Sequence, residues 1–380
     1  MKKILIVTLS FLLVACSGGK SDKVENKKED KQEVKKEEIV DISFSAVGDN
    51  LIHEAIYYYN RDANGNYSFD DIYTNTNYLT KDADISYINQ ETICGGTELG
   101  LSGYPTFNGP YEILDAVHKA GFNWLSGSSN HSFDRGEQGI VNELKYLDKY
   151  PDLTVSGIQS SADAERYHIK EVDGVKVGMI GYTYGLNGFE LPAGKEYLVN
   201  LIDLDVIKAD MEQLNQISDI QVVSMHWGEE YQFEENAEQE ELAQYLSDLG
   251  VDVIIGGHPH VIQPMDYLKG ENGNETLVIY SLGNFLSAQD VNYRMLGGMA
   301  RWTIKYNKTT KAIAFDEVAF WPTVTYISDN FKNYRTYVLK DYTDELAKTH
   351  TLTSQNQDVT RQYFIDLVES VMNDKVEIIY

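Results

Sequence analysis

Hydrophobic and polar residues follow two rhythms along the chain, one typical of strands and the other of helices. Short apolar runs bounded by polar or glycine residues predict strands at 40–47, 85–88, 122–125, 175–182, 220–225, 251–255 and 277–281. Between several of them, helical spacing of apolar residues predicts helices at 110–120, 138–149, 204–217 and 237–249. This alternation indicates an α/β domain with a largely parallel sheet.

The last quarter of the chain has a different pattern. Residues 299–306 and 312–321 predict a hairpin around the polar turn 307–310, residues 341–374 have a helical pattern, and residues 376–380 predict a last strand. We therefore expect a domain over 39–326, followed by a C-terminal extension over 327–380 that packs on or near it.

The first residues predict export from the cell. Two lysines precede an apolar run over 4–14, which is too short to cross a bilayer as a mature helix and favours a signal peptide over 1–15. The run ends in Leu-Val-Ala before Cys16, which resembles a bacterial lipobox and implies cleavage before Cys16 with a lipid on that residue. An ordinary signal peptide cleaved near Ser17 is the alternative.

A charged segment separates this leader from the predicted domain. Residues 17–38 contain seven lysines and seven acidic residues with almost nothing apolar, so residues 16–38 predict a flexible tether behind the lipidated cysteine. A single helix with i,i+4 ion pairs would serve the same role. The expected location is the extracellular face of the cell membrane, with a lipid anchor that contacts the membrane.

Net charge limits the classes of binding partner, and cysteine content limits the possible disulfides. Of the 32 basic and 59 acidic residues, 23 basic and 52 acidic ones lie from Ile39 onward, which gives that part a formal charge of −29. Such a surface repels nucleic acid, so none is expected as a partner. The chain contains only Cys16 and Cys94, so a lipidated Cys16 leaves no intramolecular disulfide.

Histidines cluster with carboxylates and amides directly after predicted strands. In open α/β sheets the carboxyl ends of the strands share one crevice, so these residues are expected to converge there. The candidate metal ligands are Asp49, His53, Glu91, Asn130, His226, His258 and His260. Neutral imidazoles and carboxylates suit Mn²⁺, Zn²⁺, Fe²⁺ or Co²⁺. Seven donors are too many for one four-coordinate ion and fit two ions that share a carboxylate.

Each residue taken alone also has a purely structural interpretation. Asp49 could cap a helix, Asn130 could form a turn, and His53 could be a hydrogen-bonded loop histidine. The pair His258 and His260 is hardest to explain in this way, because the proline between them fixes the backbone and sends both imidazoles to one region.

Six motifs in order, GDN…H, NQET, SNHSFD, HWGEE, GGHPHVIQ and SLGNF, resemble the CapA family of poly-γ-glutamate capsule proteins over roughly residues 41–321. That family is related to the calcineurin-like metallophosphoesterases. The resemblance implies an α/β fold in which two sheets form a four-layer α/β/β/α sandwich of the metallophosphoesterase type.

The resemblance also implies roles for individual residues. Asp49 matches the first metal aspartate of metallophosphoesterases, and Glu91 takes the place of their bridging aspartate. Asn130 and His131 match a pair in which Asn binds metal and His lies above the leaving group, and His226, His258 and His260 match the later ligands. The implied cofactor is two divalent metal ions, Mn, Zn or Fe. The usual Asp-x-His is absent, because His53 lies four residues after Asp49.

Three functions remain open from the sequence. The first is a metal-dependent hydrolase or transferase at the cell surface, in which metal-bound hydroxide attacks and His131, paired with Asp134, protonates the leaving group. The second is a non-catalytic scaffold that holds, exports or tethers a polymer. The third is a metal-stabilised binding module for a sugar or phosphate. Poly-γ-glutamate or subunits of a capsule-polymer synthase are the expected partners.

Overall fold

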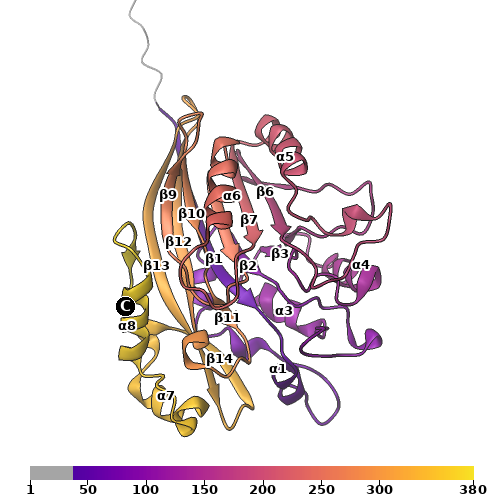
Figure 1. Cartoon of the computed structure of the whole chain (residues 1–380), viewed down its shortest axis with the longest axis vertical. Coiled ribbons are helices and arrows are strands. Elements are labelled where there is room, and N and C mark those ends of the chain that lie inside the picture. The colour runs from indigo at the N-terminus through magenta and orange to yellow at the C-terminus, as the bar shows by residue number, and fades with distance from the viewer. Residues whose placement is uncertain (1–36) are drawn as a thin grey trace, which may run out of the picture. The chain divides into compact units, whose positions relative to one another are not determined.

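The computed structural model describes residues 37–380 and contains two β-sheets in that range (Figure 1). Strand β1, Ile39–Asn50, lies in the middle of the larger sheet. The predictions of a signal peptide, of a lipid on Cys16 and of a tether therefore concern residues almost entirely outside the described part. Within residues 37–380, no helix has the length and apolar character needed to cross a membrane.

The larger sheet is mixed, with strand order β14-β13-β12-β1-β2-β3-β4. Strands β1 to β4 are parallel, whereas β12, β13 and β14 are antiparallel to their neighbours. Short strands β11 and β15 pair with β1 and β13. The bounds are β2 Ile85–Asn89, β3 Trp124–Ser126, β4 Thr154–Ser156, β11 Asn284–Leu286, β12 Leu296–Asn307, β13 Ile313–Ser328, β14 Asn333–Val338 and β15 Glu377–Ile378.

The second sheet has the order β5-β6-β7-β8-β10-β9. Its central strands β6, β7, β8 and β10 are parallel, and its edge strands β5 and β9 run antiparallel. The bounds are β5 His168–Val172, β6 Val175–Thr183, β7 Ile220–His226, β8 Val253–Gly257, β9 Met265–Lys269 and β10 Glu275–Ile279. The predicted largely parallel sheet is thus confirmed for β1 to β4 in the larger sheet and for β6, β7, β8 and β10 in the second, whereas β12 to β14 and the edge strands β5 and β9 pair in antiparallel fashion.

Residues that alternate along the strands place the two sheets face to face. In β7, Val222 belongs to the core shared with the larger sheet, while Val223 packs with the helices α5 (Leu204–Ile217) and α6 (Ala237–Asp248). In β2, the Tyr87 hydroxyl lies 2.8 Å from the Ser224 hydroxyl of β7, so Ile88 points to the opposite face.

The outer face of the larger sheet is covered by helices. Helix α3 (Glu112–Lys119) buries Ile113, Leu114 and Val117 in the same core as β1 and β2, and α8 (Arg361–Val371) adds Phe364 and Val368. The predicted four-layer α/β/β/α sandwich is confirmed. The remaining helices are α1 Glu54–Tyr59, α2 Asn77–Thr80, α4 Gly136–Leu147 and α7 Asp344–Thr349.

The C-terminal segment differs from its helical pattern. Helices α7 and α8 are separated by the 3₁₀ turn Thr351–Gln355, which ends at Asn356 with a left-handed φ of 59°. Thr360 then caps α8 by accepting the backbone N–H of Tyr363. The predicted hairpin and last strand are confirmed as β12–β13 and β15, and the predicted boundary between residues 326 and 327 lies inside β13.

Candidate metal centre

The metal centre is built around the carboxyl end of β1, where the strand register shifts at Asp49. The Asp49 backbone N–H donates to Gly283 O at 2.8 Å, and the segment is so close that a Cβ on Gly48 would lie 1.9 Å from that oxygen. Glycine at position 48 therefore allows the turn before β11 to pass beside β1.

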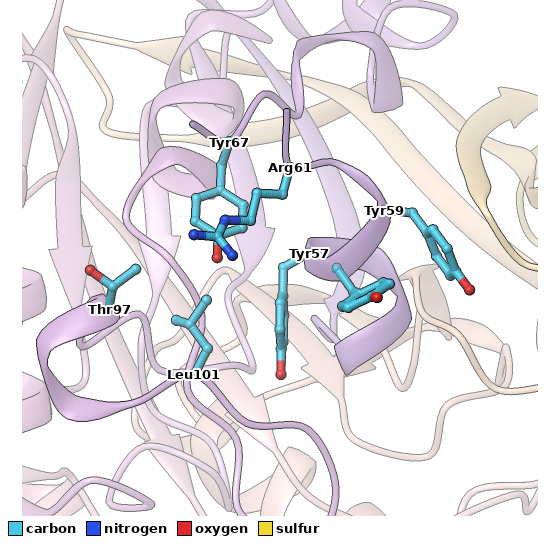
Figure 2. A pocket seen from close by; sticks show the side chains of 7 residues that line it. Tyr57, Tyr59, Arg61, Tyr67, Thr97 and Leu101 are labelled. Carbon is cyan, nitrogen blue, oxygen red and sulfur yellow. The ribbon is translucent and has the colours of Figure 1, made fainter. Parts of the chain in front are cut away.

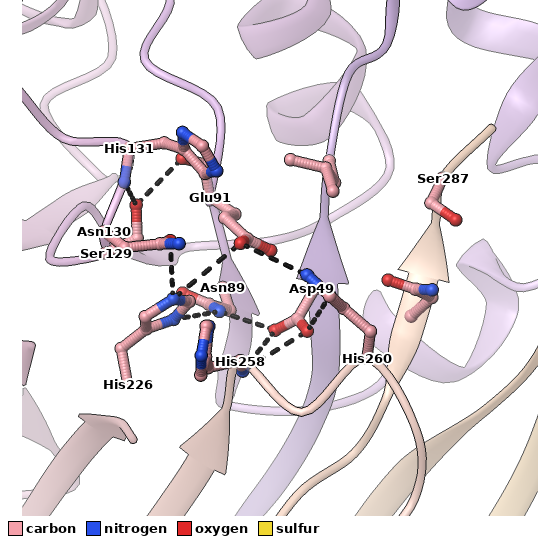
Figure 3. A network of polar contacts seen from close by, with 12 residues as sticks. Asp49, Asn89, Glu91, Ser129, Asn130, His131, His226, His258, His260 and Ser287 are labelled. Carbon is pink, nitrogen blue, oxygen red and sulfur yellow. Dashed lines mark hydrogen bonds and ion pairs between the residues drawn. The ribbon is translucent and has the colours of Figure 1, made fainter. Parts of the chain in front are cut away.

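The Asp49 side chain is fully buried and is held by three neighbours. Its Oδ1 accepts a hydrogen bond from Asn89 Nδ2 at 2.7 Å, and Oδ2 lies 3.0 Å from His260 Nδ1. The backbone N–H of His258 also donates to the carboxylate, at 3.2 Å to Oδ1. Asp49 is thus fixed by the ends of β2 and β8, as Figure 3 shows.

Glu91 lies at the centre of the cluster, and within residues 37–380 neither of its carboxylate oxygens has a hydrogen-bond partner. It is fully buried, and its Oε1 is 3.7 Å from both His226 Nε2 and His260 Nε2. Burial raises the pKa of Glu91 well above its usual range. A buried carboxylate without partners is strongly unfavourable, so this arrangement fits a site for cations.

Three overlapping sets of side chains each bring potential ligand atoms within 4.8 Å of one another. Glu91 belongs to two of the sets, as expected of a carboxylate shared between two ions, and the exposed Glu230 joins the third. The sets are Glu91 with His226 and His258, Asp49 with Glu91 and His260, and Glu230 with His258 and His260.

The histidines are held in orientations suited to ligands. His226 lies between two amides, with Nε2 2.9 Å from Asn130 Oδ1 and Nδ1 3.2 Å from Asn89 Nδ2. Burial and the neighbouring histidines lower the pKa of His226 well below its usual range and that of His258 to about 3. Both imidazoles are therefore neutral, which is the form that binds metal.

His260 has the opposite electrostatic environment. Burial disfavours its charged form, but the carboxylates of Glu91 and Asp49 outweigh burial and raise the pKa of His260 to about 9. In the absence of metal, a protonated His260, with Nε2 3.7 Å from Glu91 Oε1, partly offsets the negative charge of the neighbouring carboxylates. A bound cation would replace that proton.

A histidine–aspartate pair borders the cluster. His131 Nδ1 lies 2.7 Å from Asp134 Oδ2, which also accepts the backbone N–H of Phe107 at 2.6 Å. The pair is tied to the ligand loop, because Ser129 Oγ accepts from the His131 backbone at 3.1 Å and donates to Glu91 O at 2.8 Å. With Nδ1 committed to Asp134, Nε2 is the nitrogen that can exchange a proton.

His53 is not in any of the three sets formed by residues 37–380. Its Nδ1 faces the backbone, 3.2 Å from both Leu51 O and Ala288 N, and burial lowers its pKa to about 4. Its ring stands edge-on to Phe107 at 5.2 Å, and Phe107 in turn contacts His131 at 4.6 Å. The structure thus places His53 beside the site, and its role as a ligand stays a prediction.

Three site residues were not predicted as such from the sequence. Asn89 pairs in register with Asp49, and its position at the end of β2, before Gln90-Glu91, was a usable signal. Glu230 lies in the HWGEE motif. Tyr184 follows β6 and covers the histidines, with its ring centroid 4.7 Å from that of His258, and no local motif marks it.

The donor set fits divalent metal ions on structural grounds. Three buried imidazoles and two buried carboxylates face one another. Both oxygens of Glu91 and the Nδ1 of His258 have no hydrogen-bond partner in the described part of the chain. Buried oxygen and nitrogen atoms that lack hydrogen-bond partners and lie close together are what a divalent cation needs as ligands.

Comparison with known proteins finds relatives among capsule biosynthesis proteins. The chain is 29% identical over 208 residues to the PGA biosynthesis protein CapA of Bacillus subtilis and 31% identical over 205 residues to the capsule biosynthesis protein CapA of Bacillus anthracis. These matches cover 52% of this chain and 51% and 48% of the relatives, so the chain spans about half the length of either curated relative.

A solved structure with lower similarity is the NAD nucleotidase of Haemophilus influenzae. It is 15% identical, with a TM-score of 0.46, and the match covers 90% of this chain and 57% of the nucleotidase chain.

A family model also matches the chain. The model described as bacterial capsule synthesis protein PGA_cap matches residues 43–289, which include every candidate ligand from Asp49 to His260. This range is more than half of the chain, and the chain therefore belongs to the PGA_cap family of bacterial capsule synthesis proteins.

Proposed function

We propose that this protein is a metal-dependent hydrolase that acts in capsule-polymer metabolism at the outer face of the cell membrane. The observation that carries the proposal is the unpartnered buried carboxylate of Glu91, shared between two ligand sets, beside the His131–Asp134 pair. A carboxylate shared in this way supports two divalent ions, Mn, Zn or Fe, rather than one.

The residues that would hold the ions are those whose ligand atoms converge. Glu91 would be shared, and the remaining ligands would be Asp49, Asn130, His226, His258 and His260. When bound, two such ions supply Lewis acidity and neutralise negative charge on a substrate oxygen. Asn89 would orient the first carboxylate, because it donates to Asp49 at 2.7 Å.

The proton for the leaving group would come from His131. Asp134 holds its Nδ1, so Nε2 can carry a proton to an oxygen that departs from the substrate. The backbone N–H of Phe107 keeps Asp134 in place, so the imidazole is oriented before substrate binds. A protein that only tethers polymer has no need of such a pair.

The proposed location follows from residues 1–38. A lipid on Cys16 would contact the membrane, and the charged segment behind it would let the domain reach synthase subunits or poly-γ-glutamate. Labelling of cells with radioactive palmitate tests the anchor. Label in the wild-type chain that is lost in Cys16→Ala supports lipidation, whereas equal label in both rules it out.

A non-catalytic scaffold is the second candidate. It is favoured by the placement of His53, whose Nδ1 faces the backbone rather than the ligand sets. Metal analysis of the purified full-length chain, beside His226→Ala/His258→Ala, tests for the site itself. About two equivalents of a transition metal, lost in the variant, are expected.

Turnover then separates the two candidates. Phosphoester and γ-glutamyl substrates are screened with the metal-loaded protein and with His131→Ala. A hydrolase is expected to lose turnover in His131→Ala by on the order of 10²- to 10⁴-fold while it keeps its metal. Absence of bound metal, with none gained from added Mn²⁺ or Zn²⁺, would refute the hydrolase proposal.

A further inference from the structure

Tyrosine side chains line a groove on the protein surface. It is formed by helix α1 and the loop after it, and we call it the tyrosine groove. Its cavity has a volume of about 670 Å³ and is lined by Tyr57, Tyr58, Tyr59, Arg61, Tyr67, Thr97 and Leu101. Figure 2 shows Arg61 lying across the Tyr67 ring, with Tyr57 and Leu101 below them.

A second cavity next to the groove reaches His53. This cavity of about 540 Å³ shares Tyr58 and Tyr59 with the groove and is also lined by Tyr104. From His53 the contacts run through Phe107 to the His131 ring, at centroid distances of 5.2 and 4.6 Å.

Three of the tyrosines that line these two cavities are exposed to solvent. Tyr58, Tyr59 and Tyr104 have 63%, 45% and 81% of their surface accessible. Tyrosine presents a flat apolar face together with a hydroxyl that can donate and accept hydrogen bonds. Several such rings around one groove match a ligand made of units with apolar faces and hydroxyl edges, as in a sugar chain.

Arg61 adds one positive charge to the groove. Within residues 37–380, no carboxylate lies within ion-pair distance of Arg61, whose Nε has a long contact of 3.4 Å with Gly65 O. The adjacent Asp62 carboxylate is engaged by Asn64 and Asn66 of its own loop. The Arg61 guanidinium is therefore free to bind an anionic group on a ligand.

We propose that the tyrosine groove binds an acidic polysaccharide in which neutral sugars separate the carboxylated ones. In the described part of the chain, Arg61 is the one cation that lines either cavity, and Glu54 lines the second. One cation among four tyrosines fits a chain with widely spaced charges. A polymer with a carboxylate on every unit would place several anions against a protein of net charge −27.

The inference rests on the proposed function for the general class of ligand, a capsule polymer, but binding tests it without turnover. Isothermal titration uses the full-length chain in detergent. The probes are a hyaluronan octasaccharide, in which glucuronate alternates with an N-acetylated sugar, a neutral maltooctaose, and a γ-linked glutamate oligomer with the same number of carboxylates.

Arg61→Gln is expected to weaken hyaluronan binding by about tenfold or more and to leave maltooctaose binding unchanged. The control Lys208→Gln, which removes an exposed charge on α5, is expected to change neither. Tyr58→Leu/Tyr59→Leu should weaken both sugars, whereas the Phe/Phe pair, which keeps the rings, should retain most of the binding.

Three results would overturn the proposal: no octasaccharide binding, binding that Arg61→Gln does not change, or tighter binding of the glutamate oligomer with the same dependence on Arg61. Titration beside metal analysis separates this inference from the proposed function. Sugar binding by a purified chain that holds no metal, gains none from added Mn²⁺ or Zn²⁺ and shows no turnover would refute the hydrolase alone. Turnover of a small phosphoester without sugar binding would refute the groove alone.

Discussion

Glu143 provides a quantitative test of how the loop behind the metal centre is held. This residue of α4 is 1% exposed, and its carboxylate accepts the backbone N–H of Cys94, three residues after the central ligand Glu91. Burial raises the pKa of Glu143 from 4.5 to about 7, although the hydrogen bond from Cys94 acts in the opposite direction. We predict that Glu143→Gln stabilises the protein at neutral and alkaline pH.

The magnitude follows from the two pKa values. The difference between 4.5 in the unfolded chain and about 7 in the folded protein corresponds to roughly 3 kcal/mol of unfolding free energy. Below pH 4.5 the carboxyl is protonated in both states and costs nothing. As pH rises to about 7 the unfolded chain loses the proton that the folded protein keeps, so wild-type stability falls, and the loss is complete above that pH.

Urea unfolding of chelated protein at pH 5 and pH 8 measures the effect. The Gln side chain can still accept the Cys94 N–H, so Glu143→Gln should gain most of the roughly 3 kcal/mol between the two pH values. Glu241→Gln, at an exposed position of α6, serves as the control for one lost charge. If the advantage of Glu143→Gln over wild type is the same at both pH values, Glu143 titrates alike in both states and the reasoning is refuted.

Three further predictions concern the metal centre. Gly257→Ala would place a Cβ 2.6 Å from Asp49 Oδ1 and should lower metal content. The control Gly185→Ala, at a position with open space around it, should leave metal content unchanged. Equal metal content in the two variants would contradict this prediction. Free metal at 100 times Kd should raise the unfolding free energy of the wild type by about 2.7 kcal/mol and that of Glu91→Gln by much less. Thermal melts with and without chelator measure this difference. Asp134→Asn should keep its metal but lower kcat on the order of a hundredfold, because the His131 imidazole loses its anionic partner. An unchanged pH–rate profile in this variant would count against that role of Asp134.

The elements whose apolar residues recur at a regular spacing could be predicted from the sequence. Helix α5 was predicted at its observed bounds, because its apolar residues recur along one buried face. The edge strands β5 and β9 were missed, because their partly exposed residues carry a weak apolar signal and their pairing depends on distant strands. The break between α7 and α8 depends on one left-handed residue, Asn356, in a segment with a helical composition.

The candidate site could be predicted where chemistry and strand ends coincide. Parallel pairing of β1 and β2 brings Asp49 and Glu91 together, and the face-to-face packing of the two sheets adds His226 from the end of β7. The orientation of His53 could not be predicted, since it depends on the backbone of residue 288 across the fold. Tyr184 was missed for the same reason, because nothing local to it indicates that the histidines lie beneath its ring.

The position of β1 has a consequence for how the chain acquires its structure during synthesis. Its partner on one side, β2, emerges from the ribosome soon after it, but its partner on the other side, β12, begins only at Leu296. One edge of this apolar strand therefore stays open to unwanted pairing while most of the protein is made. A chaperone that binds extended apolar segments would have its longest opportunity at β1, and a chain truncated before β12 should aggregate rather than fold.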